Sequence, residues 1–277
     1  MRVLISAAEL LAAGERVVLL DVRWALGDPN GRQHYLEGHL PDAVFVDLET
    51  ELADPPSPAA GRHPLPSLQR LQSVARRWGI RDGDAVVAYD ATGGLAAARA
   101  WWLLRWGGLS DVRLLDGGLD AWVAAGGKLE TGDVTPEAGD VTLTGGGMSV
   151  LSIDEAAALP AAGGVLLDAR AGERYRGEVE PIDPRAGHVP GAVSAPTTGN
   201  LDADGAFLPA DVLRERFAAL GVRPGTTLGV YCGSGVTAAH EVAALAVAGI
   251  GAALWPGSWS QWSADPARPA ATGPDPG

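Results

Sequence analysis

The stretch GVRPGTTLGVYC, residues 221–232, has a close counterpart earlier in the chain, GIRDGDAVVAYD, residues 79–90. Both copies begin with a glycine, an apolar residue and an arginine, contain a turn glycine, and run through an apolar segment to a tyrosine. A turn that leads into a short apolar run is typical of a buried β-strand. The copies lie 142 residues apart in a chain of 277, so each half is predicted to contain the same strand.

Further segments repeat in the same order at offsets of 140 to 149 residues. They are LLDVR at 19–23 with LLDAR at 166–170, GHLPDAV at 38–44 with GHVPGAV at 187–193, and DGGLDAW at 116–122 with PGSWSQW at 256–262. Self-similarity at a nearly constant spacing indicates a tandem duplication. We predict an N-terminal domain at 1–130, a linker rich in Gly, Thr, Asp and Pro at 131–147, and a C-terminal domain at 148–277.

Within each half, short apolar runs such as VVLLDV alternate with longer helical patterns such as SLQRLQSVARRWG. Strands that alternate with helices need crossover connections, which produce a mainly parallel sheet with helices on both faces. Each half is therefore predicted to be an α/β domain. The loop after the strand that ends at Tyr89 or Tyr231 should lie at the carboxyl edge of its sheet, where such folds bind ligands.

Composition excludes several classes of protein. The chain carries 34 acidic and 21 basic residues, a net charge of −13 that repels the phosphates of nucleic acid. A single cysteine forms no internal disulfide, and no uncharged run approaches the roughly 20 residues of a membrane helix. We expect a soluble cytoplasmic protein with no membrane contact. The five histidines show no metal-ligand spacing and no phosphate-binding glycine fingerprint occurs, so neither metal nor cofactor is expected.

The one cysteine, Cys232, directly follows the predicted strand of the second half and precedes a helical pattern. The segment GSG at 233–235 turns the chain between them, and glycines let successive amide N–H groups point at one centre. The helix N-terminus adds partial positive charge at the same point. Such a cradle favours the thiolate over the thiol, and it would also hold an anionic persulfide.

Two alternatives compete with a reactive thiol. A lone cysteine is often a small buried apolar side chain. In the first half, however, Asp90 aligns with Cys232 and Gly93 with Gly235, which favours one active and one inactive copy of the same loop. A cysteine-dependent phosphatase needs an arginine six positions after the cysteine to clamp phosphate, and Ala238 stands there instead.

Taken together, the tandem layout, GHLPDAV and GHVPGAV, GRHPLP at 61–66, CGSGVTA at 232–238 and PGSWSQW resemble a two-domain rhodanese. This is the thiosulfate and 3-mercaptopyruvate sulfurtransferase family. The loop Cys-Gly-Ser-Gly-Val-Thr resembles that of the mercaptopyruvate enzymes, whereas thiosulfate enzymes typically carry Arg and Lys after the cysteine. The resemblance implies transfer of sulfur from 3-mercaptopyruvate through a Cys232 persulfide to cyanide or a thiol such as thioredoxin, with release of pyruvate. The alternatives are thiosulfate as the donor, or a persulfide carrier or redox-sensing module without turnover.

The resemblance also assigns site residues. The substrate carboxylate is expected at Arg174 and Arg185, and Ser234 is expected to act in catalysis with Asp28 and His39. The substrate and persulfide are expected to contact the loop residues Gly233, Gly235, Val236 and Thr237. For the arginines the competing interpretation is a solvated surface position. His39 and His188 occupy equivalent places in the two copies, so a shared structural role competes with catalysis for His39.

Overall fold

The computed structural model describes residues 2–14 and 16–277. The chain divides into two compact units. Unit 1 contains the residues up to Asp54, Pro66–Met148 and Asp202–Phe207, and unit 2 contains Pro55–Leu65, Ser149–Leu201 and Leu208–Gly277. Each unit is thus built mainly from one half of the sequence and takes in one short segment of the other half.

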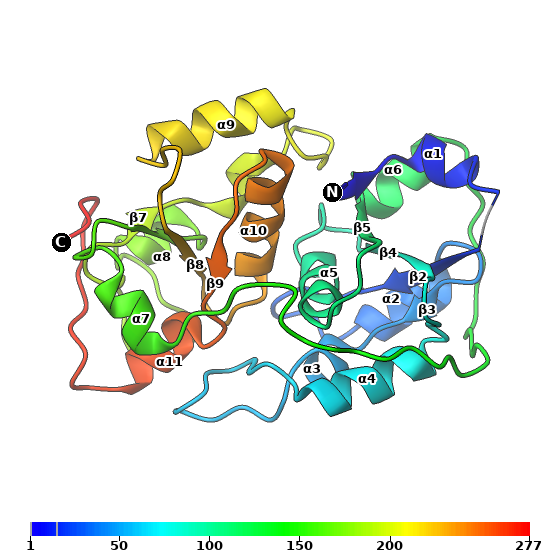
Figure 1. The fold of residues 1–277 in the computed structure, drawn as a ribbon, viewed down its shortest axis with the longest axis horizontal. Coiled ribbons are helices and arrows are strands. Elements are labelled where there is room, and N and C mark those ends of the chain that lie inside the picture. Colours follow the sequence, from blue (N-terminus) through cyan, green and yellow to red (C-terminus); the bar gives the residue numbers. More distant parts are fainter. Residues whose placement is uncertain (1, 15) are drawn as a thin grey trace. The chain divides into compact units, whose positions relative to one another are not determined.

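Unit 1 is a five-stranded parallel sheet covered by helices on both faces (Figure 1). The strand order is β1-β5-β4-β2-β3, and α1 and α6 pack on the face that buries Val87 and Tyr89. The strands are β1 Leu4–Ile5, β2 Val17–Asp21, β3 Val44–Phe45, β4 Ala85–Tyr89 and β5 Val112–Leu115. The helices are α1 Ala7–Leu11, α2 Gly31–Glu37, α3 Leu48–Glu51, α4 Leu68–Arg77, α5 Ala97–Trp106 and α6 Gly118–Ala124.

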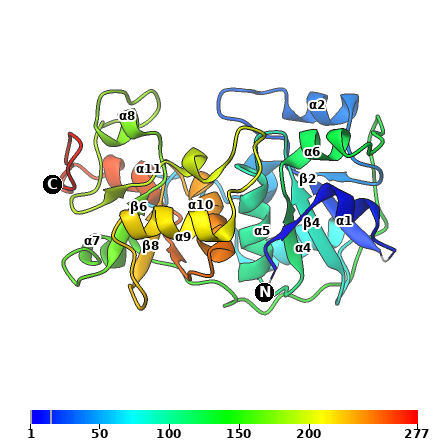
Figure 2. The ribbon, with the colours of Figure 1, turned by 90° about the horizontal axis from the view of Figure 1, so that it is seen from above.

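Unit 2 repeats this architecture with a four-stranded parallel sheet of order β7-β6-β8-β9 (Figure 2). Helices α7 and α11 bury tryptophan side chains on one face, and α10 packs against β8 and α9. The strands are β6 Val165–Asp168, β7 Val193–Ser194, β8 Leu228–Tyr231 and β9 Ala253–Leu254. The helices are α7 Ile153–Ala158, α8 Gly172–Tyr175, the 3-10 helix η1 Thr197–Asn200, α9 Ala210–Ala219, α10 Thr237–Val247 and α11 Ser258–Ala264.

The two units share specific contacts as well as strand order. Val150 forms a parallel bridge with Leu254, in the place that β1 takes beside β5 in unit 1. The Tyr89 hydroxyl accepts a hydrogen bond from Leu40 N at 3.0 Å, and the Tyr231 hydroxyl accepts one from Val189 N at 3.2 Å. The prediction of two α/β domains with mainly parallel sheets is confirmed, because both the topology and the buried tyrosine contacts occur twice.

The segment 131–147, predicted as a linker, runs along unit 1 and contributes to its core. Val141 and Leu143 are buried. Arg76 Nε donates to Val141 O at 2.9 Å, which ties the segment to the end of α4. The segment has no regular secondary structure. Packing and hydrogen bonds to its backbone hold it against unit 1.

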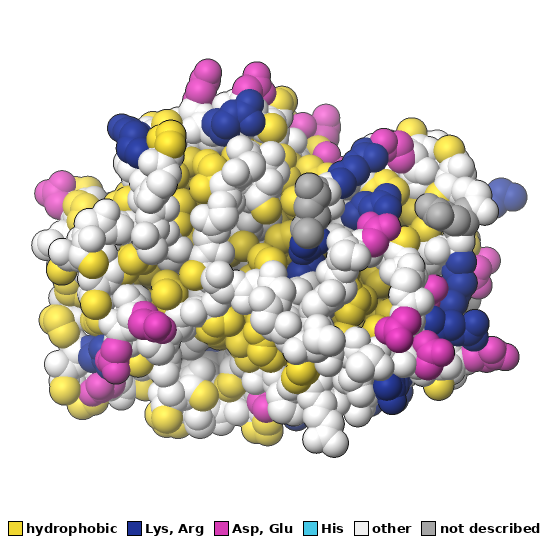
Figure 3. All heavy atoms as spheres, viewed as in Figure 1, with side chains coloured by type: hydrophobic (Ala, Val, Ile, Leu, Met, Phe, Trp, Pro, Cys, Tyr) yellow, Lys and Arg dark blue, Asp and Glu magenta, His cyan; other side chains and the backbone are white. Residues whose placement is uncertain are grey.

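On the face of unit 1 that Figure 3 shows, basic and acidic side chains lie intermixed rather than sorted by sign. Surface pairs of opposite charge include Arg16 with Asp84 at 3.1 Å and Arg77 with Glu51 at 3.0 Å. Such exposed pairs contribute little to stability, about 0–1 kcal/mol each. Among the described residues, no helix is long and apolar enough to span a membrane.

Helix α10 carries a fully buried acidic side chain, Glu241. Asn200 Nδ2 donates a hydrogen bond to Glu241 Oε2 at 2.6 Å, and Arg216 Nε donates to Asn200 Oδ1 at 2.9 Å. Burial disfavours the charged carboxylate and raises the pKa of Glu241 from 4.5 to about 7. The stability of unit 2 should therefore depend on pH through this group.

The variant Glu241→Gln should lose that pH dependence. In the unfolded chain this carboxyl group ionises near pH 4.5, whereas in the folded chain it keeps its proton up to about pH 7. The folded state binds more protons between these values, so wild-type stability falls as pH rises through the window. The unfolding free energy of the variant minus that of wild type should therefore increase by about 3 kcal/mol between pH 4 and pH 8. Urea unfolding at each pH measures this difference. The exposed control Glu215→Gln should show no such gain, and parallel pH profiles for Glu241→Gln and wild type would contradict the prediction.

Candidate active site

The backbone at Cys232 is fixed by the sheet below it and by α11 beside it. Strand β8 is buried along its whole length between β6 and β9, and Cys232 is the next residue after it. Cys232 N donates to Ser258 Oγ at 3.1 Å, and Cys232 O accepts from Trp259 N at 3.0 Å. The cysteine therefore stands at the carboxyl edge of the unit 2 sheet, where the sequence predicts a ligand site.

The thiol of Cys232 lies under the loop that connects β8 to α10. Its side chain is 1% exposed, and Gly235 N donates to Cys232 Sγ at 3.1 Å. Gly235 has φ +80°, and a Cβ there would lie 2.5 Å from Pro256 O. Only glycine therefore fits at 235, and its tight turn is what aims the amide at the sulfur. Val236 and Thr237 complete the loop and begin α10.

The equivalent loop of unit 1 surrounds the side chain of Asp90. Asp90 follows β4, and its carboxylate accepts four backbone N–H bonds: Oδ1 from Thr92 N and Gly94 N, both at 2.8 Å, and Oδ2 from Ala96 N at 2.8 Å and Ala97 N at 2.9 Å. The loop before the helix has six residues in unit 1 and four in unit 2. At the residue that follows the strand, four backbone amides donate to the Asp90 side chain in unit 1, and the Gly235 amide donates to the Cys232 sulfur in unit 2.

Ser234 pairs with a histidine that the sequence analysis did not select. His63 Nδ1 lies 2.7 Å from Ser234 Oγ, and both side chains are buried. His63 belongs to the Pro55–Leu65 segment, which is part of unit 2. That segment is anchored on α11, because Arg62 N donates to Ser260 Oγ at 3.1 Å and Gln261 Nε2 donates to Ala59 O at 2.7 Å. The motif GRHPLP contains this histidine. The second half has no matching histidine, so comparison of the two halves did not single it out.

His39 makes structural contacts within unit 1, and its expected role with Ser234 stays a prediction. Its Nδ1 lies 2.9 Å from Leu40 O, its Nε2 lies 3.2 Å from Gly132 O, and its ring stacks on Tyr35 at 4.3 Å. His188 makes the matching contacts in unit 2: its Nδ1 lies 2.8 Å from Tyr175 O, and its ring stacks on Tyr175 at 3.7 Å. The shared structural role therefore explains why the histidine occurs in both copies.

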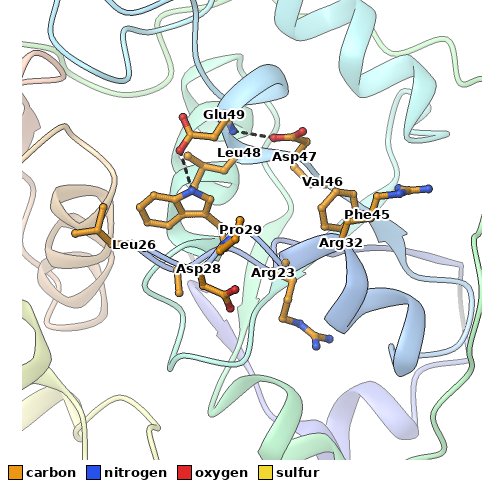
Figure 4. Close-up of a pocket in the computed structure, with 14 residues that line it drawn as sticks. Arg23, Leu26, Asp28, Pro29, Arg32, Phe45, Val46, Asp47, Leu48 and Glu49 are labelled. Carbon is orange, nitrogen blue, oxygen red and sulfur yellow. Dashed lines mark hydrogen bonds between the residues drawn. The ribbon is translucent and has the colours of Figure 1, made fainter.

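Asp28 lies in a pocket of unit 1 of about 620 Å³ (Figure 4). Its Oδ1 accepts from Asn30 N at 2.8 Å, and its Oδ2 lies 3.1 Å from His34 Nε2. The bond from Asn30 and the nearby His34 lower the pKa of Asp28, so the group is a carboxylate at neutral pH. Its hydrogen-bond partners are residues of its own loop and α2, and its expected role in catalysis stays a prediction.

Two arginines approach the cysteine loop at Gly233. A Cβ at that position would lie 2.9 Å from Arg62 Nη2 and 3.5 Å from Arg174 Nη1. The absence of a side chain at 233 is what lets both guanidinium groups come so near the residue that follows Cys232. Arg174, an expected substrate ligand on α8, is therefore at the loop, and it is joined there by Arg62, which the sequence analysis did not select.

Arg185 is engaged elsewhere, which corrects its assignment as the second carboxylate ligand. Its guanidinium donates to four backbone carbonyl oxygens: Ser263 O at 3.0 Å, Arg268 O at 2.7 Å, Trp262 O at 2.9 Å and Asp265 O at 2.7 Å. A cation that satisfies the last carbonyl groups of α11 stabilises that helix end. Arg185 thus holds α11 in place under the cysteine loop, where Arg62 supplies the second cation.

Acidic side chains pair with both arginines near the loop. Asp183 Oδ1 forms an ion pair with Arg62 Nη1, and Asp183 Oδ2 lies 3.3 Å from Arg174 Nη2. Glu180 Oε1 lies 2.6 Å from the same Arg174 nitrogen. Burial raises the pKa of Asp183, and its two arginine partners oppose that shift. Among residues 2–14 and 16–277, no group of three or more His, Cys, Asp and Glu side chains is arranged to hold a metal ion.

The geometry agrees with comparisons to known proteins. The family model described as a rhodanese-like domain matches residues 6–125 and again residues 152–265. A protein of Mycobacterium tuberculosis named for thiosulfate sulfurtransferase activity, SseB, is 52% identical over 98% of this chain and 98% of its own. A protein of Pseudomonas aeruginosa named for 3-mercaptopyruvate sulfurtransferase activity is 49% identical over 97% of this chain and 99% of its own.

A solved structure gives the same result for the fold. The crystal structure of SseA from Escherichia coli, a 3-mercaptopyruvate sulfotransferase, matches with a TM-score of 0.82 and 32% identity, over 94% of this chain and 99% of that one. Two tandem rhodanese-like domains, one of which has a cysteine directly after its central strand, define the class, and the chain belongs to the rhodanese family. It is a sulfurtransferase, as the activity named for both relatives indicates.

Proposed function

We propose that this chain transfers a sulfane sulfur from 3-mercaptopyruvate to a thiol, through a persulfide on Cys232. The observation that carries the proposal is the arrangement around Gly233 and Ser234. The Cys232 sulfur accepts an amide hydrogen bond, two guanidinium groups flank the next residue, and the Ser234–His63 pair follows directly. A nucleophile, a carboxylate site and a proton-transfer pair thus belong to one loop and its immediate neighbours.

Arg62 and Arg174 are the proposed ligands of the substrate carboxylate. Guanidinium groups bind carboxylates through two parallel charge-assisted hydrogen bonds, and their planar shape fixes the orientation of the acid. With the carboxylate held beside Gly233, the sulfur of a three-carbon acid can reach the neighbouring cysteine. The amides of Gly233, Gly235, Val236 and Thr237 then hold the terminal sulfur of the persulfide.

The first step is nucleophilic attack by the Cys232 thiolate on the sulfur of mercaptopyruvate. An S–S bond forms, the C–S bond breaks, and its electron pair passes to carbon 3 as the enolate of pyruvate. The enolate carbon then takes up one proton, which balances the proton released from the substrate thiol, and pyruvate leaves. The oxidation levels balance without any added oxidant or reductant.

Ser234 and His63 have the geometry to stabilise the enolate oxygen and to supply a proton to the leaving pyruvate. When His63 Nδ1–H donates to Ser234 Oγ, the serine hydroxyl is free to donate to the ketone oxygen on which negative charge develops. The 2.7 Å contact is short enough for direct proton transfer within the pair. In the second step an acceptor thiol attacks the terminal sulfur of the persulfide; we propose a cytoplasmic thiol of the thioredoxin type, with cyanide as an assay substitute.

Thiosulfate is the second candidate donor. The name of the Mycobacterium tuberculosis relative favours it, and so does the pair of guanidinium groups at Gly233, because thiosulfate is an anion. The loop itself carries no cation, with Gly233 and Ser234 in the positions after the cysteine. Ser234 and His63 favour mercaptopyruvate, since a departing sulfite needs no proton from the protein.

A side-by-side donor assay tests the proposal. Pyruvate released from mercaptopyruvate and sulfite released from thiosulfate are measured on the same preparation, with a thiol acceptor or cyanide in excess. We expect kcat/KM for mercaptopyruvate to exceed that for thiosulfate by at least about tenfold, the effect of one well-placed hydrogen bond in the transition state. A preference for thiosulfate would establish the second candidate, and a single stoichiometric loading without turnover would indicate a persulfide carrier.

A further inference from the structure

An acidic side chain occupies the space between the two arginines at the cysteine loop. Asp183 directs one carboxylate oxygen to Arg62 and the other to Arg174, and its side chain is 4% exposed. The arrangement is the one that a substrate carboxylate would take between the same two guanidinium groups. Asp183 is therefore an internal anion at the proposed anion site.

The position of Asp183 is set by its own turn. The carboxylate of Glu180 accepts hydrogen bonds from Ile182 N at 3.2 Å and from Asp183 N at 3.1 Å, with Oε1 as the acceptor in both. The same Glu180 oxygen pairs with Arg174. The turn 180–183 thus sets the position of Asp183 beside the two arginines.

The charges around the loop cancel. A third arginine, Arg170, forms two ion pairs: its Nη2 lies 2.6 Å from Asp168 Oδ2, and its Nη1 lies 3.4 Å from Glu180 Oε2. The cluster contains three guanidinium groups and three carboxylates, namely Arg62, Arg170, Arg174, Asp168, Glu180 and Asp183, and all six side chains are at most 26% exposed. A donor that binds there adds its whole charge to a neutral, largely buried cluster, where charges interact strongly.

We propose that Asp183 is a specificity-determining residue that competes with the donor for Arg62 and Arg174 and thereby selects monoanionic over dianionic sulfur donors. The inference rests on the proposed function in that these arginines are the donor's ligands. Coulomb energy is proportional to the charge of the donor, so the repulsion from Asp183 is twice as large for a dianion as for a monoanion at the same site. Mercaptopyruvate carries one negative charge at neutral pH and thiosulfate carries two.

The test is the variant Asp183→Asn, which removes the charge and keeps the shape. Dissociation constants of propanoate, a monoanion, and sulfate, a dianion, are measured by isothermal titration at pH 7.5 and low salt. If the variant tightens propanoate binding by a factor f of about ten, it should tighten sulfate binding by f squared, about a hundredfold. In donor assays, the ratio of kcat/KM for thiosulfate to that for mercaptopyruvate should rise by about tenfold.

Two control variants separate this effect from others. Glu178→Gln removes an exposed carboxylate that pairs with Arg176, and it should leave both anion affinities unchanged. Asp183→Glu keeps the charge and should keep the wild-type ratio of the two affinities. Equal tightening for both anions would overturn the proposal. Weakened binding of both would also overturn it, because Asp183 would then serve to position the arginines. The titrations use unreactive anions, so their outcome stands even if the wild-type chain releases no pyruvate.

Discussion

Replacing Cys232 by serine is expected to abolish sulfur transfer from either donor, with kcat/KM lowered by about 10⁴-fold or more. Removal of a covalent nucleophile eliminates the two-step route itself, and such losses are among the largest seen for single substitutions. The fold should persist, because a serine Oγ can accept the hydrogen bond that Gly235 N donates to Sγ. Unfolding in urea should therefore follow the same curve for the variant and for wild type.

Mass spectrometry provides the direct measurement of the intermediate. The chain contains one cysteine, so an added sulfur of about 32 Da on the intact protein after treatment with donor identifies the Cys232 persulfide without peptide mapping. Wild type should show this adduct and lose it when a thiol acceptor is added. An adduct on the serine variant, or turnover retained by it, would contradict the assignment of Cys232 as the sulfur carrier.

The variant His63→Gln should produce the second largest loss of activity, a decrease in kcat for mercaptopyruvate of about 10²- to 10³-fold. The reason is the loss of proton transfer through Ser234, a contribution typical of general acid–base catalysis. KM should change little, since the carboxylate ligands stay in place. Ser234→Ala should lower kcat to a similar extent, and the double variant should be no worse than either single variant, because the two side chains act as one unit.

His39→Gln is the matched control for this experiment. His39 is as buried as His63, but its ring nitrogens face carbonyl oxygens within unit 1. We expect this variant to be less stable to urea, with kcat per folded molecule close to wild type. If His39→Gln lowered kcat as much as His63→Gln, the proton-transfer role of the Ser234–His63 pair would be wrong.

Several features of this protein could be predicted because they depend on short stretches of chain. The strands that end at Tyr89 and Tyr231 are apolar runs bounded by turns, and each pairs at the centre of a parallel sheet. The position of Cys232 before a glycine turn and a helix follows from the same local pattern. Its replacement by Asp90 in the first copy is equally visible in sequence, and the structure adds that this carboxylate fills its loop with four amide bonds.

The partners of the cysteine loop were harder to predict, because they come from segments that the repeat does not relate. The family resemblance assigned His39 a catalytic role, whereas its repetition in GHLPDAV and GHVPGAV pointed to the structural contact that both units make. His63 stands in a segment without a counterpart, and its place beside Ser234 depends on the packing of that segment against α11. Likewise Arg185 and Arg62 are both arginines near prolines, and only the carbonyl groups that surround Arg185 distinguish their roles.

The amino-acid sequence by itself determined the duplication, the α/β class, the family and the position of the single cysteine, because hydrophobic periodicity, turn glycines and a unique thiol are local properties of the chain. Tertiary structure alone decided which histidine lies beside Ser234 and which arginines lie beside Gly233. Those choices depend on where the Pro55–Leu65 segment packs and on which buried cations already have carbonyl or carboxylate partners. Contacts between residues more than a hundred positions apart are set by the packing of whole elements, and no local pattern encodes them.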